Sequence, residues 1–98
     1  MRLKAKIDAN QPEIVKALRQ IGCSVQHLHQ LGQGCPDILI GVAGFNVLAE
    51  IKDSAKPPSA RNLTEDEQDW HDAWRGQVSI ITCVDDALRV VRYFREQR

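Results

Sequence analysis

Residues 36–53 have the sequence PDILIGVAGFNVLAEIKD and decide the fold. Two apolar runs, residues 37–42 and 46–53, flank an Ala-Gly pair at 43–44. This arrangement is typical of two antiparallel strands joined by a tight turn. Asp37, Glu50 and Lys52 lie on these apolar runs, where an unpaired buried charge is costly. The sequence therefore predicts a hairpin whose three charged residues have a role other than packing.

The turn sets the register of that hairpin. If residues 43–44 form a two-residue turn, counting back along both strands places Asp37 opposite Glu50. Side chains alternate along a strand, so Lys52 shares a face with Glu50. Opposed carboxylates repel each other unless positive charge lies between them, which a divalent cation and Lys52 would supply. A slip of one residue would place Asp37 opposite Ile51 and break the arrangement.

The segments around the hairpin alternate between helical and strand patterns. Apolar residues recur at helical spacing in residues 11–21, 64–74 and 86–94, and strand patterns occupy residues 24–31 and 78–83. The proline-containing segment 54–62 is predicted to be a loop. The expected fold class is α/β, with the order α-β-β-β-α-β-α and a mixed central sheet flanked by helices. A single domain spanning residues 1–98 suits this length.

Capping residues mark the expected helix starts. Asn10 precedes Pro12, which suits the first turn of a helix. Thr64 and Glu67 have the spacing of a capping box. Asp85 is the expected cap of the last helix.

Composition limits the classes of protein that the chain can belong to. The formal net charge is zero, but basic residues outnumber acids over residues 1–62. Three of the acids in that range are Glu13, Asp37 and Glu50, which are candidate metal ligands. No run of about 20 apolar residues is present, so no membrane span is expected. The cysteines number three and lack metal-ligand spacing, which favours reduced thiols in a cytoplasmic protein.

Asp37, Glu50 and Lys52 together suit the hydrolysis of a phosphodiester bond. Mg²⁺ prefers oxygen ligands and is commonly held by one or two carboxylates, waters and substrate phosphates. A bound metal lowers the pKa of an attacking water, and a neighbouring amine stabilises developing negative charge.

The chain resembles the PD-(D/E)XK nuclease superfamily, and within it the VRR-NUC (virus-type replication-repair nuclease) family. The segments that carry the resemblance are GCPDILIG (34–41), LAEIKD (48–53), LTEDEQDWHDAW (63–74) and GQVSII (76–81). The resemblance covers roughly residues 10–90 and implies a restriction-endonuclease-like core and a Mg²⁺-dependent endodeoxyribonuclease, with Mn²⁺ able to substitute. The metal ligands it implies are Glu13, Asp37, Glu50 and the backbone carbonyl of Ile51, with Lys52 and Gln68 as further catalytic residues.

Residues near the hairpin are candidates for DNA contact. Lys56 and Arg61 lie on the proline-containing loop after the second strand of the hairpin, and Gln33 lies in a glycine-flanked loop before Asp37. No sequence-reading helix is evident, so structure-selective cutting is expected. A symmetric homodimer acting on a four-way junction or other branched DNA is the expected assembly.

Several alternatives remain open. The chain could bind nucleic acid without cutting it, or be a small interaction protein whose acids are structural. Glu13 could serve only the helix dipole, and Gln68 could be a solvated helix residue. His27 and His29 suit a packed or surface pair better than a zinc site, which needs further ligands. Trp70 and Trp74 could cover the sheet or a dimer contact, or stack on a base.

Overall fold

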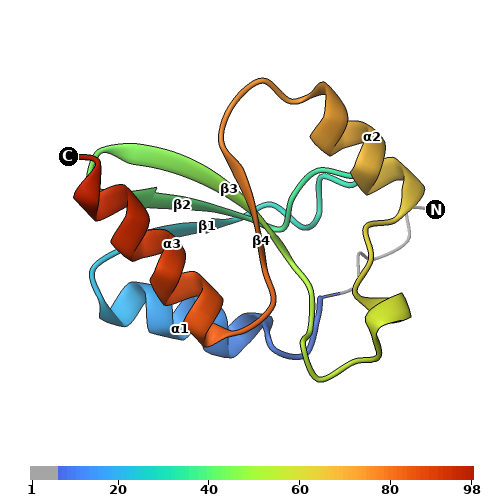
Figure 1. The fold of residues 1–98 in the computed structure, drawn as a ribbon, viewed down its shortest axis with the longest axis horizontal. Helices are drawn as coiled ribbons and strands as arrows, with labels where there is room; N and C mark the ends of the chain where they lie inside the picture. Colours follow the sequence, from blue (N-terminus) through green and yellow to red (C-terminus); the bar gives the residue numbers. More distant parts are fainter. Residues whose placement is uncertain (1–6) are drawn as a thin grey trace.

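The computed structural model describes residues 7–98 and has the predicted order of helices and strands (Figure 1). The helices are α1 (Gln11–Gln20), α2 (Glu65–Ala73) and α3 (Val84–Glu96), with a 3-10 turn η1 (Pro58–Ala60) between β3 and α2. The strands are β1 (Ser24–His27), β2 (Ile38–Val42), β3 (Phe45–Ile51) and β4 (Val78–Ile81). The α/β prediction is confirmed. Within residues 7–98, no helix has the length and apolar character needed to cross a membrane.

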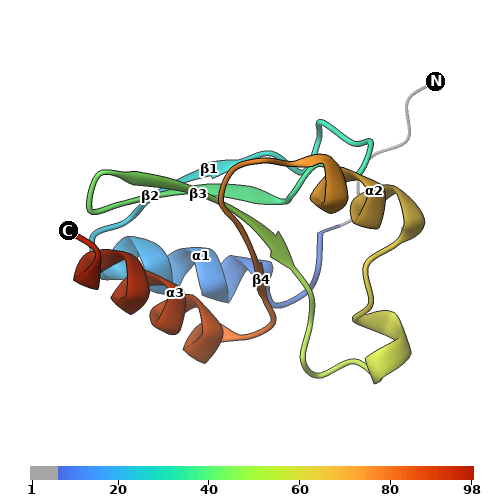
Figure 2. The ribbon, with the colours of Figure 1, turned by 45° about the horizontal axis from the view of Figure 1, so that its top comes forward.

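The four strands form one mixed sheet in the order β1-β2-β3-β4. The first three strands are antiparallel neighbours, and β4 is parallel to β3. Helices α1 and α3 lie side by side along one face, whereas α2 lies beyond one end of the sheet (Figure 2). The opposite face of the sheet therefore has no helix packed along it, as antiparallel sheets allow.

The core lies between the sheet and the pair α1 and α3. Alternate residues of β2 and β3 point into it because side chains alternate across a strand. The buried apolar strand residues are Ile38, Ile40, Val42, Val47, Ala49, Ile51 and Ile81, and they pack with Ile14, Val15, Leu18, Cys23, Ala87, Val91 and Phe94. This alternation leaves Leu48, Glu50 and Lys52 on the face away from α1 and α3.

The hairpin turn is the predicted two-residue turn. Ala43 and Gly44 both have positive φ angles, 52° and 85°, which a type I′ turn requires. Val42 pairs with Phe45, and the register continues to Ile38 opposite Ala49. The predicted register is therefore confirmed over the whole of β2.

The first strand is shorter than predicted. β1 ends at His27, and the chain then turns, with the Leu31 N–H donating to the Leu28 carbonyl at 2.9 Å. The Leu28 N–H donates instead to the Asp37 carbonyl at 2.8 Å, just before β2 begins. The alternating pattern extends to Leu31, but β2 begins at Ile38, which pairs with His27. His29 therefore lies outside the strand.

The predicted caps differ in their outcome. Thr64 and Glu67 form the predicted capping box. The prediction for Asp85 is wrong, because α3 begins one residue earlier at Val84 and its N-cap, Cys83, makes no side-chain capping bond.

Asn10 does not cap α1 with its side chain, in contrast to the prediction. Its buried Nδ2 donates to the Lys52 carbonyl at 3.1 Å and to the Thr82 carbonyl at 3.0 Å. These bonds join the start of α1 to the chain just beyond the ends of β3 and β4. Asn10 therefore fixes the backbone that carries Lys52.

We expect Asn10→Ala to lower the free energy of unfolding by about 2 kcal/mol, because two hydrogen bonds of about 1 kcal/mol each are lost. Thermal and urea denaturation would measure the loss. Gln20→Ala, at an exposed position of the same helix, is the matched control. Equal stability of both variants would contradict the bridging role of Asn10.

Candidate active site

Asp37 lies at the start of β2, against the end of β3. Its backbone N–H donates to the Ala49 carbonyl at 3.0 Å, and its Oδ2 accepts from the Ile51 N–H at 2.6 Å. The Asp37 carboxylate is therefore held beside the backbone of Ile51, which is the position needed if the Ile51 carbonyl is a metal ligand.

Glu50 is buried near the end of β3, where Glu67 of α2 is among the charges that act on it. Only 2% of its surface is exposed, and within residues 7–98 its Oε1 has no hydrogen-bond partner. The Asp37 carboxyl group lies close enough to raise the pKa of Glu50. A buried carboxylate oxygen without a partner is unusual and calls for an explanation.

The surroundings of Glu50 oppose its negative charge. Burial has the largest effect, followed by Asp37 and then Glu67, and together they raise the pKa of Glu50 from 4.5 to about 10. Lys52 acts in the opposite direction but does not offset them. Without additional positive charge, Glu50 keeps its proton at neutral pH.

Lys52 is also buried, and its amine is bound to a residue of α2. Its Nζ lies 2.7 Å from Glu67 Oε1. Burial by itself would lower the pKa of Lys52, but the hydrogen bond and charge of Glu67, with Glu50 and Asp8, raise it above the ordinary value. The Lys52 amine is therefore a fixed cation beside the two acids.

Glu67 is a member of the site that the sequence analysis assigned only to a helix cap. Its Oε1 accepts from the Thr64 N–H at 2.8 Å as well as from Lys52, so one oxygen serves both. Burial acts to raise the pKa of Glu67, but the bonds from Lys52 and Thr64 outweigh it and lower the pKa. The capping box was the available signal, since it turns the Glu67 side chain back toward the helix start.

The loop before Asp37 fixes the start of α2. Gly34 has a φ of +80°, and a Cβ there would lie 2.2 Å from the Asp66 carbonyl oxygen. This close backbone approach explains the glycine, because a side chain would displace the first turn of α2. The loop thereby holds Glu67 within reach of Lys52.

Two predicted site residues are exposed, unlike Glu50 and Lys52. Gln68 is exposed, and its amide donates to Asp72 at 2.8 Å along the outer side of α2. Glu13 is exposed in the first turn of α1. The structure thus places Glu67, rather than its neighbour Gln68, at Lys52.

The candidate DNA-contacting residues lie on the periphery. Lys56 forms a 2.9 Å ion pair with Asp8, and such exposed pairs are weak enough for a phosphate to compete. Arg61 is half-buried just after η1. Gln33 is exposed, with a positive φ of 56°.

The carboxylates of the site provide only part of the coordination shell of a divalent cation. Among residues 7–98, no three His, Cys, Asp or Glu side chains converge on a common metal position, and this also leaves His27 and His29 without a third ligand. Mg²⁺, however, needs only one or two carboxylates when waters and substrate oxygens complete its shell. Asp37 and the unpartnered Glu50 Oε1 meet that smaller requirement.

Comparison of the chain with protein-family models, curated protein sequences and solved structures found no match. The function must therefore be inferred from the residues of the site.

The raised pKa of Glu50 predicts a pH-dependent stability. Between about pH 4.5 and about pH 10, folded Glu50 retains a proton that the unfolded chain releases, so the free energy of unfolding falls as pH rises. Glu50→Gln mimics the protonated form and should remove this part of the loss. Saturating Mg²⁺ should also reduce it, because the cation replaces the proton.

Thermal denaturation from about pH 6 to about pH 9 would test this linkage. Glu96→Gln, at an exposed position of α3, is the control for a change of charge alone. An unchanged pH slope in Glu50→Gln would show that Glu50 ionises normally and would contradict the expectation.

Proposed function

We propose that this chain is a Mg²⁺-dependent endodeoxyribonuclease, with Mn²⁺ able to substitute. The observation that carries the proposal is the buried Glu50 carboxyl group, which has an unpartnered oxygen beside Asp37 and a fixed lysine nearby. A structural acid would normally have its hydrogen bonds satisfied. A divalent cation would satisfy Glu50 and offset the repulsion between the two acids.

The residues of the chain divide the work of phosphodiester hydrolysis. Asp37, Glu50 and the Ile51 carbonyl would hold the metal, which polarises the phosphate and lowers the pKa of a bound water. Lys52 would stabilise the charge that develops when water oxygen attacks phosphorus. One P–O ester bond breaks, leaving a phosphate monoester on one product and a hydroxyl on the other. Glu67 would orient the Lys52 amine.

Branched DNA, such as a four-way junction, is the proposed substrate. The resemblance to VRR-NUC nucleases supports this class. Lys56 and Arg61 would contact phosphates beside the site. The protein is proposed to act in the cytoplasm, which fits its three unpaired cysteines.

We expect Lys52→Ala to abolish Mg²⁺-dependent cleavage, a loss of at least about 100-fold, because the fixed positive charge is removed. Labelled four-way, flap, nicked and plain duplex DNA would be incubated with each variant and the products resolved on gels. Lys16→Ala, at an exposed position of α1, is the control for loss of a lysine. Circular dichroism would confirm folding, and full cleavage by folded Lys52→Ala would contradict the mechanism.

One observation favours a second candidate, a nucleic-acid-binding module of the same fold that does not cut. Glu67 offsets the positive charge of the Lys52 amine through a 2.7 Å ion pair. For Lys52 to stabilise the charge that develops during cleavage, this ion pair would have to open or weaken. Binding of branched DNA by the wild-type protein without cleavage in Mg²⁺ or Mn²⁺ would support this alternative. Cleavage that disappears in Asp37→Asn would exclude it.

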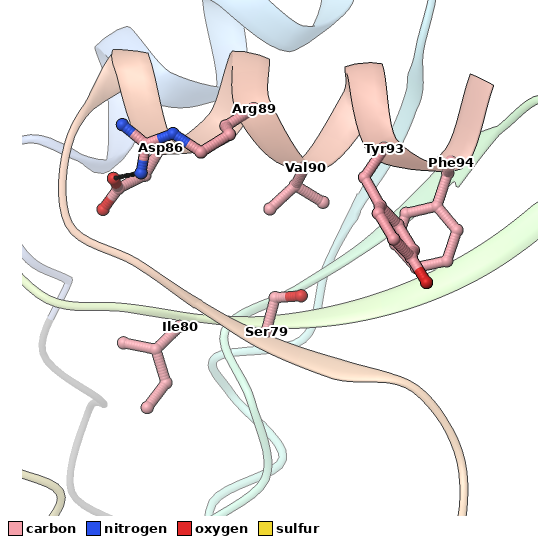
Figure 3. A pocket seen from close by; sticks show the side chains of 7 residues that line it. All are labelled: Ser79, Ile80, Asp86, Arg89, Val90, Tyr93 and Phe94. Carbon is pink, nitrogen blue, oxygen red and sulfur yellow. Dashed lines mark hydrogen bonds and ion pairs between the residues drawn. The ribbon is translucent and has the colours of Figure 1, made fainter. Parts of the chain in front are cut away.

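The edge strand β4 is the proposed surface of a homodimer. A hollow of about 410 Å³ lies between β4 and α3, where Ile80 and Tyr93 are 48% and 56% exposed (Figure 3). The other edge, β1, has polar exposed residues instead. Antiparallel pairing of two β4 strands about a two-fold axis would extend the sheet and leave both sites on one face. Three strand spacings of about 4.8 Å would separate the two β3 strands by about 14 Å.

We expect Ile80→Asp to convert a dimer into a monomer, because it places a charge at the centre of the paired edge. Size-exclusion chromatography with light scattering would measure the mass of each variant. Leu31→Asp, at a 62% exposed loop position, is the matched control. A monomeric wild-type protein, or a dimer unaffected by Ile80→Asp, would contradict this surface.

A further inference from the structure

A second feature lies on the same face of the sheet as Glu50 and Lys52. It is a shallow groove of about 480 Å³ between the outer face of β2 and β3 and the chain after α2. The groove is lined by Leu39, Asn46, Leu48, Trp74, Gly76 and Gln77. Its floor is apolar, whereas Asn46 and Gln77 are exposed amides.

The groove lies close to the proposed active site along β3. Leu48 precedes Glu50 by two residues and points to the same face, so the two lie about 6.6 Å apart along the strand. A strand of DNA with a phosphate at Glu50 would therefore present an adjacent nucleotide to the groove.

The aromatic wall of the groove is built in a defined way. Trp70 and Trp74 stack with their ring centres 4.6 Å apart and their planes 18° from parallel. Trp74 remains 44% exposed. A Cβ on Gly76 would lie 2.8 Å from the indole Nε1 of Trp74, so the absence of a side chain at residue 76 lets the indole lie close to the backbone. The wall is thus a supported flat surface rather than a single loose side chain.

We propose that this groove binds an unpaired nucleobase of the strand being cut, stacked on Trp74 with the amides of Asn46 and Gln77 at its polar edge. The inference rests on the proposed nuclease function and specifies its substrate class. A flat base with polar edges matches an aromatic wall, an apolar floor and an amide rim. A paired base inside a duplex has both faces occupied by its neighbours and cannot enter.

The consequence is a preference for DNA that has an unpaired nucleotide next to the scissile phosphate. Branch points, flaps and bulges offer such nucleotides, whereas continuous duplex does so only if a base is flipped out, at a cost of a few kcal/mol. The groove therefore gives a physical basis for selecting the shape of DNA without reading its sequence.

The test compares binding of two DNA probes, a duplex with one unpaired nucleotide and the fully paired duplex of the same sequence. Fluorescence anisotropy would be measured in Mg²⁺ in a Lys52→Ala background, so that cleavage does not interfere. We expect Trp74→Ala to weaken binding of the probe with the unpaired nucleotide by about tenfold and to leave binding of paired duplex unchanged. Trp74→Phe, which keeps an aromatic ring, should retain most of the binding.

Each other outcome has a definite meaning. Equal weakening on both probes, or no weakening on either, would overturn the base-binding role. A change in oligomeric state in Trp74→Ala would assign the groove to a second copy of the chain and would also overturn it. Because binding is measured without cleavage, a wild-type protein that fails to cut DNA would sink the proposed function and leave this result interpretable.

Discussion

The buried carboxyl group of Glu50 is the constraint on which the site depends. Removing an ionised carboxylate from water costs several kcal/mol unless charge and hydrogen bonds compensate for it. Here Asp37 and Glu67 add negative charge, so the chain compensates by keeping Glu50 protonated. A fold selected for stability alone would place an apolar residue at this position. A buried, protonated Glu50 is better explained if its proton is exchanged for a metal ion when the site is in use.

The ion pair between Lys52 and Glu67 follows from that constraint. A buried ion pair adds little to the free energy of unfolding compared with well-packed apolar residues. The pair is therefore better explained by its holding the Lys52 amine in place than by a gain in stability. Glu67 Oε1 accepts from both Lys52 and the backbone of Thr64, which couples the lysine to the start of α2. The tight fit of Gly34 against Asp66 adds the loop before Asp37 to the same unit.

Local signals were sufficient for the hairpin and for the proximity of Asp37 and Glu50. A two-residue turn and strict alternation leave little freedom in register, and the structure has the predicted register from Val42 opposite Phe45 to Ile38 opposite Ala49. Contacts between distant segments were not predictable in this way. The bonds from Asn10 to Lys52 and Thr82 span residues far apart in the chain, and local sequence indicated only a cap. The contact of Glu67 with Lys52 was not predicted, because the capping box already explained an acid at that position.

The uncovered face of the sheet connects these features. Helices α1 and α3 bury the alternate residues of β2 and β3, and the remaining alternation places Leu48, Glu50 and Lys52 together on the other side. Folding alone favours burying apolar groups and solvating charged ones, yet here Glu50 and Lys52 are buried while Leu48 is only half-buried. A bound strand of nucleic acid has both an apolar base face and an anionic backbone, with adjacent nucleotides a few ångströms apart. Leu48 and Glu50, two residues apart on one face of β3, could contact the base and the phosphate of such a ligand.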